Sequence, residues 1–192
     1  MGTRKILILD AHPDPEPRHF VHALAQAYAD GAERHESRLL KLAELDFPIL
    51  RSPEEWTHGA VPAAIIDALA DIAWADHLVI LYPLWLGDMP ALLKAFLEQA
   101  MRPGFAFKYV DGGFPLKLLK GRSARIVVTM GMPRLWYSAV YRAHSLKTLK
   151  RNILYFVGIH PVACTIIGSV EGSERRRHKW LDRMKALGAA GR

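Results

Sequence analysis

Residues 77–83 read His-Leu-Val-Ile-Leu-Tyr-Pro, and this stretch decides the fold of the chain. Its apolar content is nearly continuous rather than alternating, which is typical of a parallel strand that helices cover on both faces. Gly87 and Asp88 then close a loop, and Pro90 stands in the first turn of a helix predicted over Ala91–Met101. The segment therefore predicts the central strand of an open α/β sheet.

The same alternation of strand and helix continues in both directions along the chain. Four more strands are predicted at Lys5–Leu9, Leu39–Leu42, Ala124–Thr129 and Val162–Ile167. Helices are predicted from Phe20, from the capping pattern Ser52-Pro53-Glu54-Glu55, and over Ile65–Trp74, Tyr141–Phe156 and Glu174–Leu187. The stretch 102–120 contains several glycines and is expected to be irregular. We therefore expect a doubly wound, five-stranded parallel sheet of order 2-1-3-4-5, in one domain covering residues 1–192.

Composition excludes several classes of protein. The chain has 192 residues, of which 51% are hydrophobic and 23% charged, as in ordinary globular domains. The longest apolar run, Leu78–Leu86, is far shorter than the roughly 20 residues of a membrane span, and the N-terminal sequence lacks a secretory signal. We expect no membrane insertion and a cytoplasmic protein. The single cysteine, Cys164, lies in the apolar run Val162–Ile167 and is predicted to be a buried, inert thiol.

Charge is distributed unevenly between the two parts of the chain. Residues 1–116 hold 10 basic and 16 acidic side chains, a net charge of −6, whereas residues 117–192 hold 16 basic and 3 acidic, a net charge of +13. The basic run Arg175–Lys179 falls on the predicted C-terminal helix, where a solvated face is the favoured interpretation and nucleic acid the least favoured. The nine histidines are scattered, and no metal-binding pattern is present, so we predict no metal.

Three loops at the carboxyl ends of the predicted strands are the candidates for a binding site. His12, Arg18 and His19 precede a helix, where an anion such as phosphate is favoured, although a rigid proline turn with surface histidines explains them equally well. Leu84, Trp85 and Leu86 follow the central strand and suit a flat apolar ligand, with a core or interface role for Trp85 as the alternative. The third loop contains Thr129, Met130, Gly131 and Met132, followed by Trp136 and Tyr137. A phosphate group at one end and aromatic rings at the other favour a flavin nucleotide over a hydrolytic site.

Several motifs together resemble one family. They are Ala11-His12-Pro13-Asp14-Pro15, the long stretch Tyr82-Pro83-Leu84-Trp85-Leu86-Gly87-Asp88-Met89-Pro90-Ala91-Leu92-Leu93-Lys94, Arg102-Pro103-Gly104-Phe105-Ala106-Phe107, and Leu118-Leu119-Lys120-Gly121-Arg122. This combination is similar to the flavodoxin-like NAD(P)H:quinone oxidoreductases, the group that includes DT-diaphorase and bacterial modulators of drug activity. The resemblance implies a flavodoxin-like fold, a homodimer and a noncovalent flavin, FMN or FAD. It also implies a two-electron reduction of quinone-like acceptors, with NAD(P)H as the hydride donor and flavin N5 as the carrier. An ancillary subunit of a potassium efflux system, with structural or absent flavin, is the alternative within the same fold.

The resemblance also implies roles for individual residues. His12, His19 and Phe20, with Arg18 beside them, correspond to the loop that holds the flavin phosphate. Pro83, Leu84, Trp85 and Leu86 correspond to the segment along the isoalloxazine ring, and Thr129, Met130, Gly131 and Met132 to its pyrimidine edge. Tyr137 corresponds to a catalytic tyrosine near N1 and O2, while Phe107, Tyr109 and Trp136 correspond to the substrate pocket, the first two reaching into the partner subunit. The chain departs from the family pattern at His19, Val21 and Met132, and Ala143 stands where the family has its catalytic histidine.

Overall fold

The computed structural model describes residues 2–192 and contains a five-stranded parallel sheet in the order β2-β1-β3-β6-β7. Counted along the chain, this is the predicted order 2-1-3-4-5, so the doubly wound flavodoxin-like architecture is confirmed. The strands are β1 (Lys5–Asp10), β2 (Glu36–Lys41), β3 (His77–Pro83), β6 (Ser123–Thr129) and β7 (Val162–Ile167). A two-stranded antiparallel hairpin, β4 (Phe107–Lys108) with β5 (Leu116–Lys117), lies outside this sheet.

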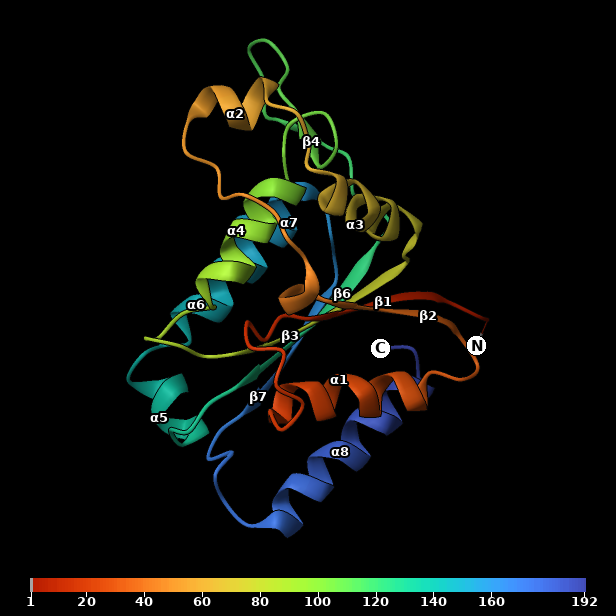
Figure 1. Cartoon of the computed structure of the whole chain (residues 1–192), viewed down its shortest axis with the longest axis vertical. Helices are drawn as coiled ribbons and strands as arrows, with labels where there is room; N and C mark the ends of the chain where they lie inside the picture. The colour runs from red at the N-terminus through yellow and green to blue at the C-terminus, as the bar shows by residue number, and fades with distance from the viewer. Residues whose placement is uncertain (1) are drawn as a thin grey trace.

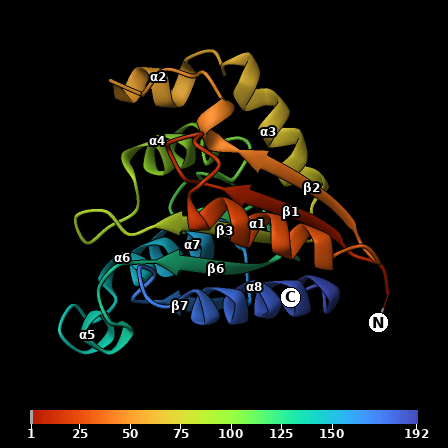
Figure 2. The same ribbon diagram turned by 60° about the horizontal axis from the view of Figure 1, so that its bottom comes forward.

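The helices form a layer on each face of the sheet (Figures 1 and 2). One layer consists of α1 (Phe20–Gly31) and α8 (Glu174–Ala189), which pack on each other. The other layer contains α3 (Ala63–Trp74), α4 (Ala91–Ala100) and the segment α6 (His144–Lys147), η2 (Thr148–Leu154) and α7 (Tyr155–Val157). Shorter elements are the 3-10 turn η1 (Leu42–Glu44), α2 (Pro53–His58) and α5 (Arg134–Ala139). No helix within residues 2–192 has the length and apolarity needed to cross a bilayer.

Strand β3 is the centre of the core, as its sequence predicts. All seven of its residues are buried, because the sheet is covered on both faces. Alternate residues of the strand face opposite layers. Ile80 and Tyr82 pack with the α3 and α4 side, while Val79 and Leu81 pack with α1 and α8. Parallel pairing with β1 and β6 sets the direction of the strand, so the carboxyl ends of all three strands lie at the same edge of the sheet.

Three expectations about elements or burial need correction. The single helix predicted over Tyr141–Phe156 begins only at His144, because Arg142 and Ala143 adopt left-handed backbone angles, and residues 148–154 form a π-helix. The hairpin β4–β5 occurs inside the stretch expected to be irregular. Cys164 is exposed rather than buried, because β7 is an edge strand whose middle residues are incompletely covered. Partial burial still raises the pKa of its thiol.

Candidate functional site

The three predicted loops meet at one edge of the sheet, where β1, β3 and β6 end side by side. The backbone N–H of Ala11 donates to the carbonyl of Leu81 at 2.8 Å, and that of Leu84 donates to Thr129 at 2.7 Å. These bonds continue the strand pairing one residue beyond β1 and β3 and thus fix the starting points of the loops. This register starts the three loops side by side at one edge of the sheet.

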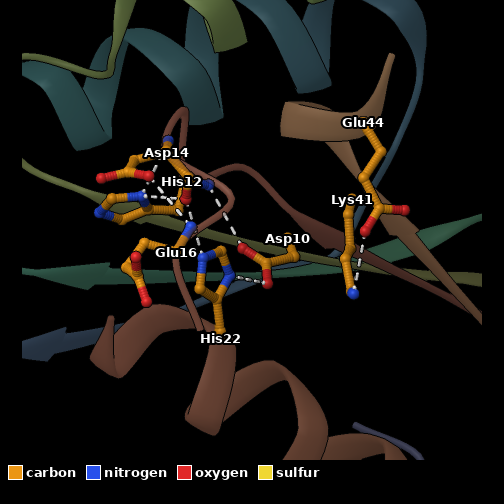
Figure 3. A network of polar contacts seen from close by, with 7 residues as sticks. All are labelled: Asp10, His12, Asp14, Glu16, His22, Lys41 and Glu44. Atoms are coloured by element: carbon orange, nitrogen blue, oxygen red, sulfur yellow. Dashed lines mark hydrogen bonds and ion pairs between the residues drawn. The ribbon is translucent and has the colours of Figure 1, made fainter. Parts of the chain in front are cut away.

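Asp10, the last residue of β1, is hydrogen-bonded to the start of the first loop. Its side chain is 1% exposed and accepts the backbone N–H of His12 at 3.3 Å. His22, in the first turns of α1, places Nδ1 at 2.5 Å from the other Asp10 oxygen and Nε2 at 2.9 Å from the carbonyl oxygen of Asp14 (Figure 3). Neither Asp10 nor His22 is among the site residues predicted from the sequence. The only signal was the three-residue spacing from His19 to His22, which places both on one face of a helix.

His12 and His19 form a stacked pair at the start of α1. Their ring centroids are 3.9 Å apart and their planes differ by 19°. Nδ1 of His12 lies 3.1 Å from both the N–H and the carbonyl oxygen of Asp14, so it can accept from the first or donate to the second. Burial lowers the pKa of His12, although its contact with the Asp14 backbone acts in the opposite direction. The buried ring of His12 thus lies against the partly exposed His19 at the start of α1.

Helix α1 begins without a cap. His19 is its N-cap residue, and its side chain makes no capping bond; Nε2 instead lies 2.8 Å from the Asp14 carboxylate. The first turn of α1 also contains no acidic residue. Free N–H groups, the positive end of the helix dipole and adjacent imidazole and guanidinium groups are the features of an anion site. The donors present here fit a flavin phosphate. Within residues 2–192, no group of three or more His, Cys, Asp or Glu is arranged to hold a metal ion.

The second loop displays apolar side chains at the sheet edge. Trp85 and Asp88 exchange two backbone hydrogen bonds of 2.9 Å, and Leu86 and Gly87 between them have φ values of 48° and 82°. Two positive φ values in succession define a tight turn of the hairpin type. The turn leaves Leu86 fully exposed and Trp85 48% exposed, with the Trp85 ring 5.9 Å edge-on from that of His12. Trp85 is therefore not a core residue, and it connects the apolar surface to the anion site. Pro83 is buried and Leu84 half-buried behind them.

The third loop is buried at its start and open further along. Thr129 and Met130 are buried, Met132 is half-buried, and Gly131 and Trp136 are exposed. Tyr137 is only 1% exposed, and its hydroxyl lies 2.8 Å from Oγ of Ser145 and accepts the Leu146 N–H at 3.4 Å. Ser145 was not identified from the sequence, because its contact with Tyr137 depends on the break at Arg142 and Ala143 that turns the chain back.

Phe107 departs from its sequence-based interpretation. It was expected to reach a partner's substrate pocket, but its ring is 2% exposed and packs against Trp56, Tyr109 and Phe156 of the same chain. Tyr109 is 58% exposed and free to make such a contact. His144, next to the position of the family's histidine, is also exposed, at the start of α6.

A parallel sheet of this order, with an uncapped first helix and an exposed apolar turn at its carboxyl edge, is typical of a flavodoxin-like α/β protein. Residues 4–187 match the family described as having a flavodoxin-like fold. The chain belongs to that family.

Individual relatives are similar over much of their length. The chain is 27% identical over 186 residues to an uncharacterized NAD(P)H oxidoreductase of Haemophilus influenzae, covering 94% of this chain and 91% of the relative. It is 30% identical over 135 residues to FMN-dependent NADH:quinone oxidoreductase 2 of Pseudomonas putida, covering 67% of this chain and 65% of the relative. The solved structure of an NAD(P)H:quinone oxidoreductase from Methanothermobacter marburgensis superposes with a TM-score of 0.82 at 24% identity, over 98% of this chain and 96% of that one. That structural likeness supports the fold.

Proposed function

We propose that this protein is a flavin-dependent NAD(P)H oxidoreductase that reduces quinones or similar acceptors by two electrons. One observation carries the proposal: the uncapped start of α1, with His12 and His19 beside it, adjoins the exposed Trp85–Leu86 turn at the carboxyl edge of the sheet. An anion site next to an apolar surface matches the two ends of a flavin nucleotide. The relatives named as NAD(P)H and FMN-dependent NADH:quinone oxidoreductases support the same activity.

Each loop has a separate task in this proposal. The first turn of α1, with His12, Arg18, His19 and Phe20, holds the phosphate through backbone and side-chain donors. Pro83, Leu84, Trp85 and Leu86 provide the surface along the ring, and residues 129–132 line its polar edge. When bound, flavin supplies the redox centre that accepts hydride from NAD(P)H and passes it on. Trp136 and Tyr109 are exposed and are proposed to contact the acceptor.

Flavin binding tests the placement of the phosphate. The double variant His12→Ala, His19→Ala removes two donors and should weaken FMN binding by about 1 to 3 kcal/mol, with riboflavin binding nearly unchanged. The matched control is His58→Ala, His178→Ala, which removes two exposed histidines on α2 and α8. Fluorescence titration gives both affinities. FMN affinity equal to that of the parent protein in the double variant would contradict the placement.

Turnover tests the reaction. The flavin-loaded protein is expected to oxidise NADH or NADPH only when a quinone is supplied, and chromatography of the released cofactor identifies FMN or FAD. A protein that binds flavin tightly but does not turn over would instead support the ancillary, non-enzymatic role.

The proposal extends to a homodimer located in the cytoplasm. Tyr109, Phe114 and Leu116 are exposed apolar side chains in and around the β4–β5 hairpin, the same region that the family resemblance assigns to the subunit interface. A second copy of the chain would cover them. The cytoplasmic location stays a prediction from the sequence.

A further inference from the structure

Asp10 and His22 are hydrogen-bonded to each other and to the loop of residues 12–19, called the phosphate loop below. Neither residue has a role in the proposed reaction. The imidazole is half-buried between the end of β1 and the loop, and each ring nitrogen faces an acceptor on a different segment (Figure 3). Through the two contacts, one side chain of α1 connects β1 to residue 14 of the loop. His12 is connected to the same carboxylate by its backbone N–H.

The contacts determine how many protons the pair contains. A carbonyl oxygen can only accept, so Nε2 must carry a proton to bond the Asp14 carbonyl. The 2.5 Å contact between Nδ1 and Oδ2 of Asp10 needs a second proton between those atoms, whichever of the two carries it. Asp10 and His22 therefore share one proton and are neutral as a unit. Loss of that proton leaves a buried negative charge directly beneath the loop.

We infer that His22 is the positioning residue of the phosphate loop, and that it holds the loop in the shape that binds a phosphorylated flavin because it and Asp10 are neutral as a unit. The inference rests on the proposed function, which places the phosphate at this loop. With the proton present, the loop is tied to β1 and α1 in the shape that presents His12 and the free N–H groups of α1. Without it, the tie weakens, and the extra negative charge repels the phosphate.

Other charged groups surround the pair and also influence binding. From the loop and α1 these are His12, Asp14, Glu16, Arg18 and His19, and from the end of β2 and η1 they are Lys41 and Glu44, which pair with each other at 3.0 Å (Figure 3). The phosphate of FMN titrates as well, with a second pKa of about 6. All of these groups remain in a variant that changes only Asp10 or His22, so a comparison of variants isolates the shared proton.

Two substitutions separate the proton from the packing. Asp10→Asn has the same shape, and its amide can donate to Nδ1 of His22 while its oxygen still accepts the His12 N–H. The geometry is kept without a shared proton. His22→Gln removes the ring and one of the two contacts. His58→Gln, on the exposed face of α2, is the matched control.

Fluorescence titrations with FMN and with riboflavin give the decisive comparison. The parent protein should prefer FMN over riboflavin. Asp10→Asn, which is neutral and keeps both contacts of the His22 ring, should retain that preference. His22→Gln should lose roughly tenfold in FMN affinity, with riboflavin affinity within about twofold of the parent. His58→Gln should match the parent throughout.

The outcomes distinguish the two proposals. A parent protein that binds FMN no better than riboflavin would contradict the placement of the phosphate itself. A clear FMN preference in the parent that Asp10→Asn loses, or that His22→Gln leaves intact, would overturn the positioning role of the neutral pair. Ring ¹⁵N shifts of His22 in the flavin-free protein provide an independent readout. They should show Nε2 protonated and Nδ1 in a strong, shared hydrogen bond, and an Nδ1 without a bonded proton partner would contradict the inference.

Discussion

Tyr137 is the side chain on which the proposed chemistry depends most directly. Its hydroxyl is held between Ser145 and the Leu146 N–H, at the back of the loop that would face the polar edge of the flavin. Leu146 donates to it, and either hydroxyl of the Tyr137–Ser145 pair can be the donor, so the phenolic proton is free for a further acceptor only when Ser145 donates. A donor preorganised at a site of developing negative charge is worth most in the transition state.

Tyr137→Phe removes only that donor and keeps the ring. Flavin reduction by NAD(P)H, measured by stopped flow, should slow by roughly tenfold to a thousandfold while flavin affinity stays nearly unchanged. The variant should also lose about 1 kcal/mol of unfolding free energy, since Ser145 and Leu146 lose a partner. Ser145→Ala, which takes away one partner and leaves the phenol, is the matched comparison. A reduction rate within about twofold of the parent would limit Tyr137 to a packing role.

His77 shows how a buried residue far from the site controls stability. Burial lowers its pKa to about 3, with the charges of Arg4 and Arg125 acting in the same direction, while Nδ1 contacts Oγ of Ser123 at 2.8 Å. An unfolded histidine titrates near pH 6.5. Between about pH 6.5 and 3 the unfolded chain therefore binds more protons, so the stability present above about pH 6.5 is lost as pH falls.

Substitution of His77 tests this linkage. As pH falls from about 6.5 to 5, proton binding by His77 in the unfolded chain should lower the unfolding free energy by about 2 kcal/mol. His77→Asn should abolish this loss. Urea denaturation at several pH values gives the slope, and the exposed His178→Asn should retain the parent's slope. If the unfolding free energy of the parent and of His77→Asn falls equally with pH, protonation of His77 is not the cause of the loss.

At the residue scale, the sequence predicts the side chains that follow the strand ends. It does not predict the side chains that contact them from other segments. His12, His19 and Trp85 follow strand ends, where topology alone brings them together. Asp10, His22 and Ser145 act through contacts between segments, and nothing in their local sequence indicates a partner. Phe107 shows the converse problem, because an aromatic residue in a loop can be buried by its own chain.

Among the elements, the segment 134–157 differs most from its prediction. One helix is predicted over Tyr141–Phe156 after a loop, but the structure contains α5, a left-handed pair at Arg142 and Ala143, and then a helix with a π turn. The break brings Ser145 and Leu146 back to Tyr137. Strand β3 has the predicted bounds because burial on both faces makes its sequence continuously apolar, and the apolar run of β7 also gives its bounds although its middle residues are exposed or half-buried. Edge strand β2 does not have the predicted bounds, since its exposed residues carry no such pattern.

The left-handed backbone of Ala143 has a measurable cost. Its φ of 49° strains any residue with a Cβ by roughly 1 to 2 kcal/mol, whereas glycine loses about 0.5 to 1 kcal/mol through the entropy of its unfolded chain. Ala143→Gly should therefore stabilise the protein by roughly 0.5 to 1 kcal/mol in urea denaturation. Ala186→Gly, at an exposed position inside α8, should destabilise it by about 1 kcal/mol. If both variants lose stability equally, the break is not left-handed in solution.

On the scale of the whole molecule, the sequence's charge asymmetry becomes a spatial one. The basic part, residues 117–192, supplies β6, β7 and α8, while β2, β1 and β3 belong to the acidic part, so the two ends of the sheet differ in charge. The two ends of the chain lie near each other (Figure 1). Nη1 of Arg4 donates to the carbonyl of Gly191 at 2.7 Å. The candidate site lies at the opposite, carboxyl edge, so terminal tags should leave it accessible.

The apolar residues left exposed predict the assembly. Tyr109, Val110, Phe114, Leu116 and Leu118 are all exposed within ten residues, and Phe114 is 96% exposed. Contiguous apolar patches of this kind are rarely left in water. The protein should sediment at about twice its chain mass of 21.6 kDa. Phe114→Asp places a charge in the proposed interface and should weaken the dimer at least tenfold, about 1.4 kcal/mol, with quinone reduction falling as monomers accumulate. Val140→Asp, at an apolar side chain that is 56% exposed at the end of α5, should leave the mass unchanged. A parent protein that is monomeric and fully active would contradict both the dimer and a substrate pocket shared between subunits.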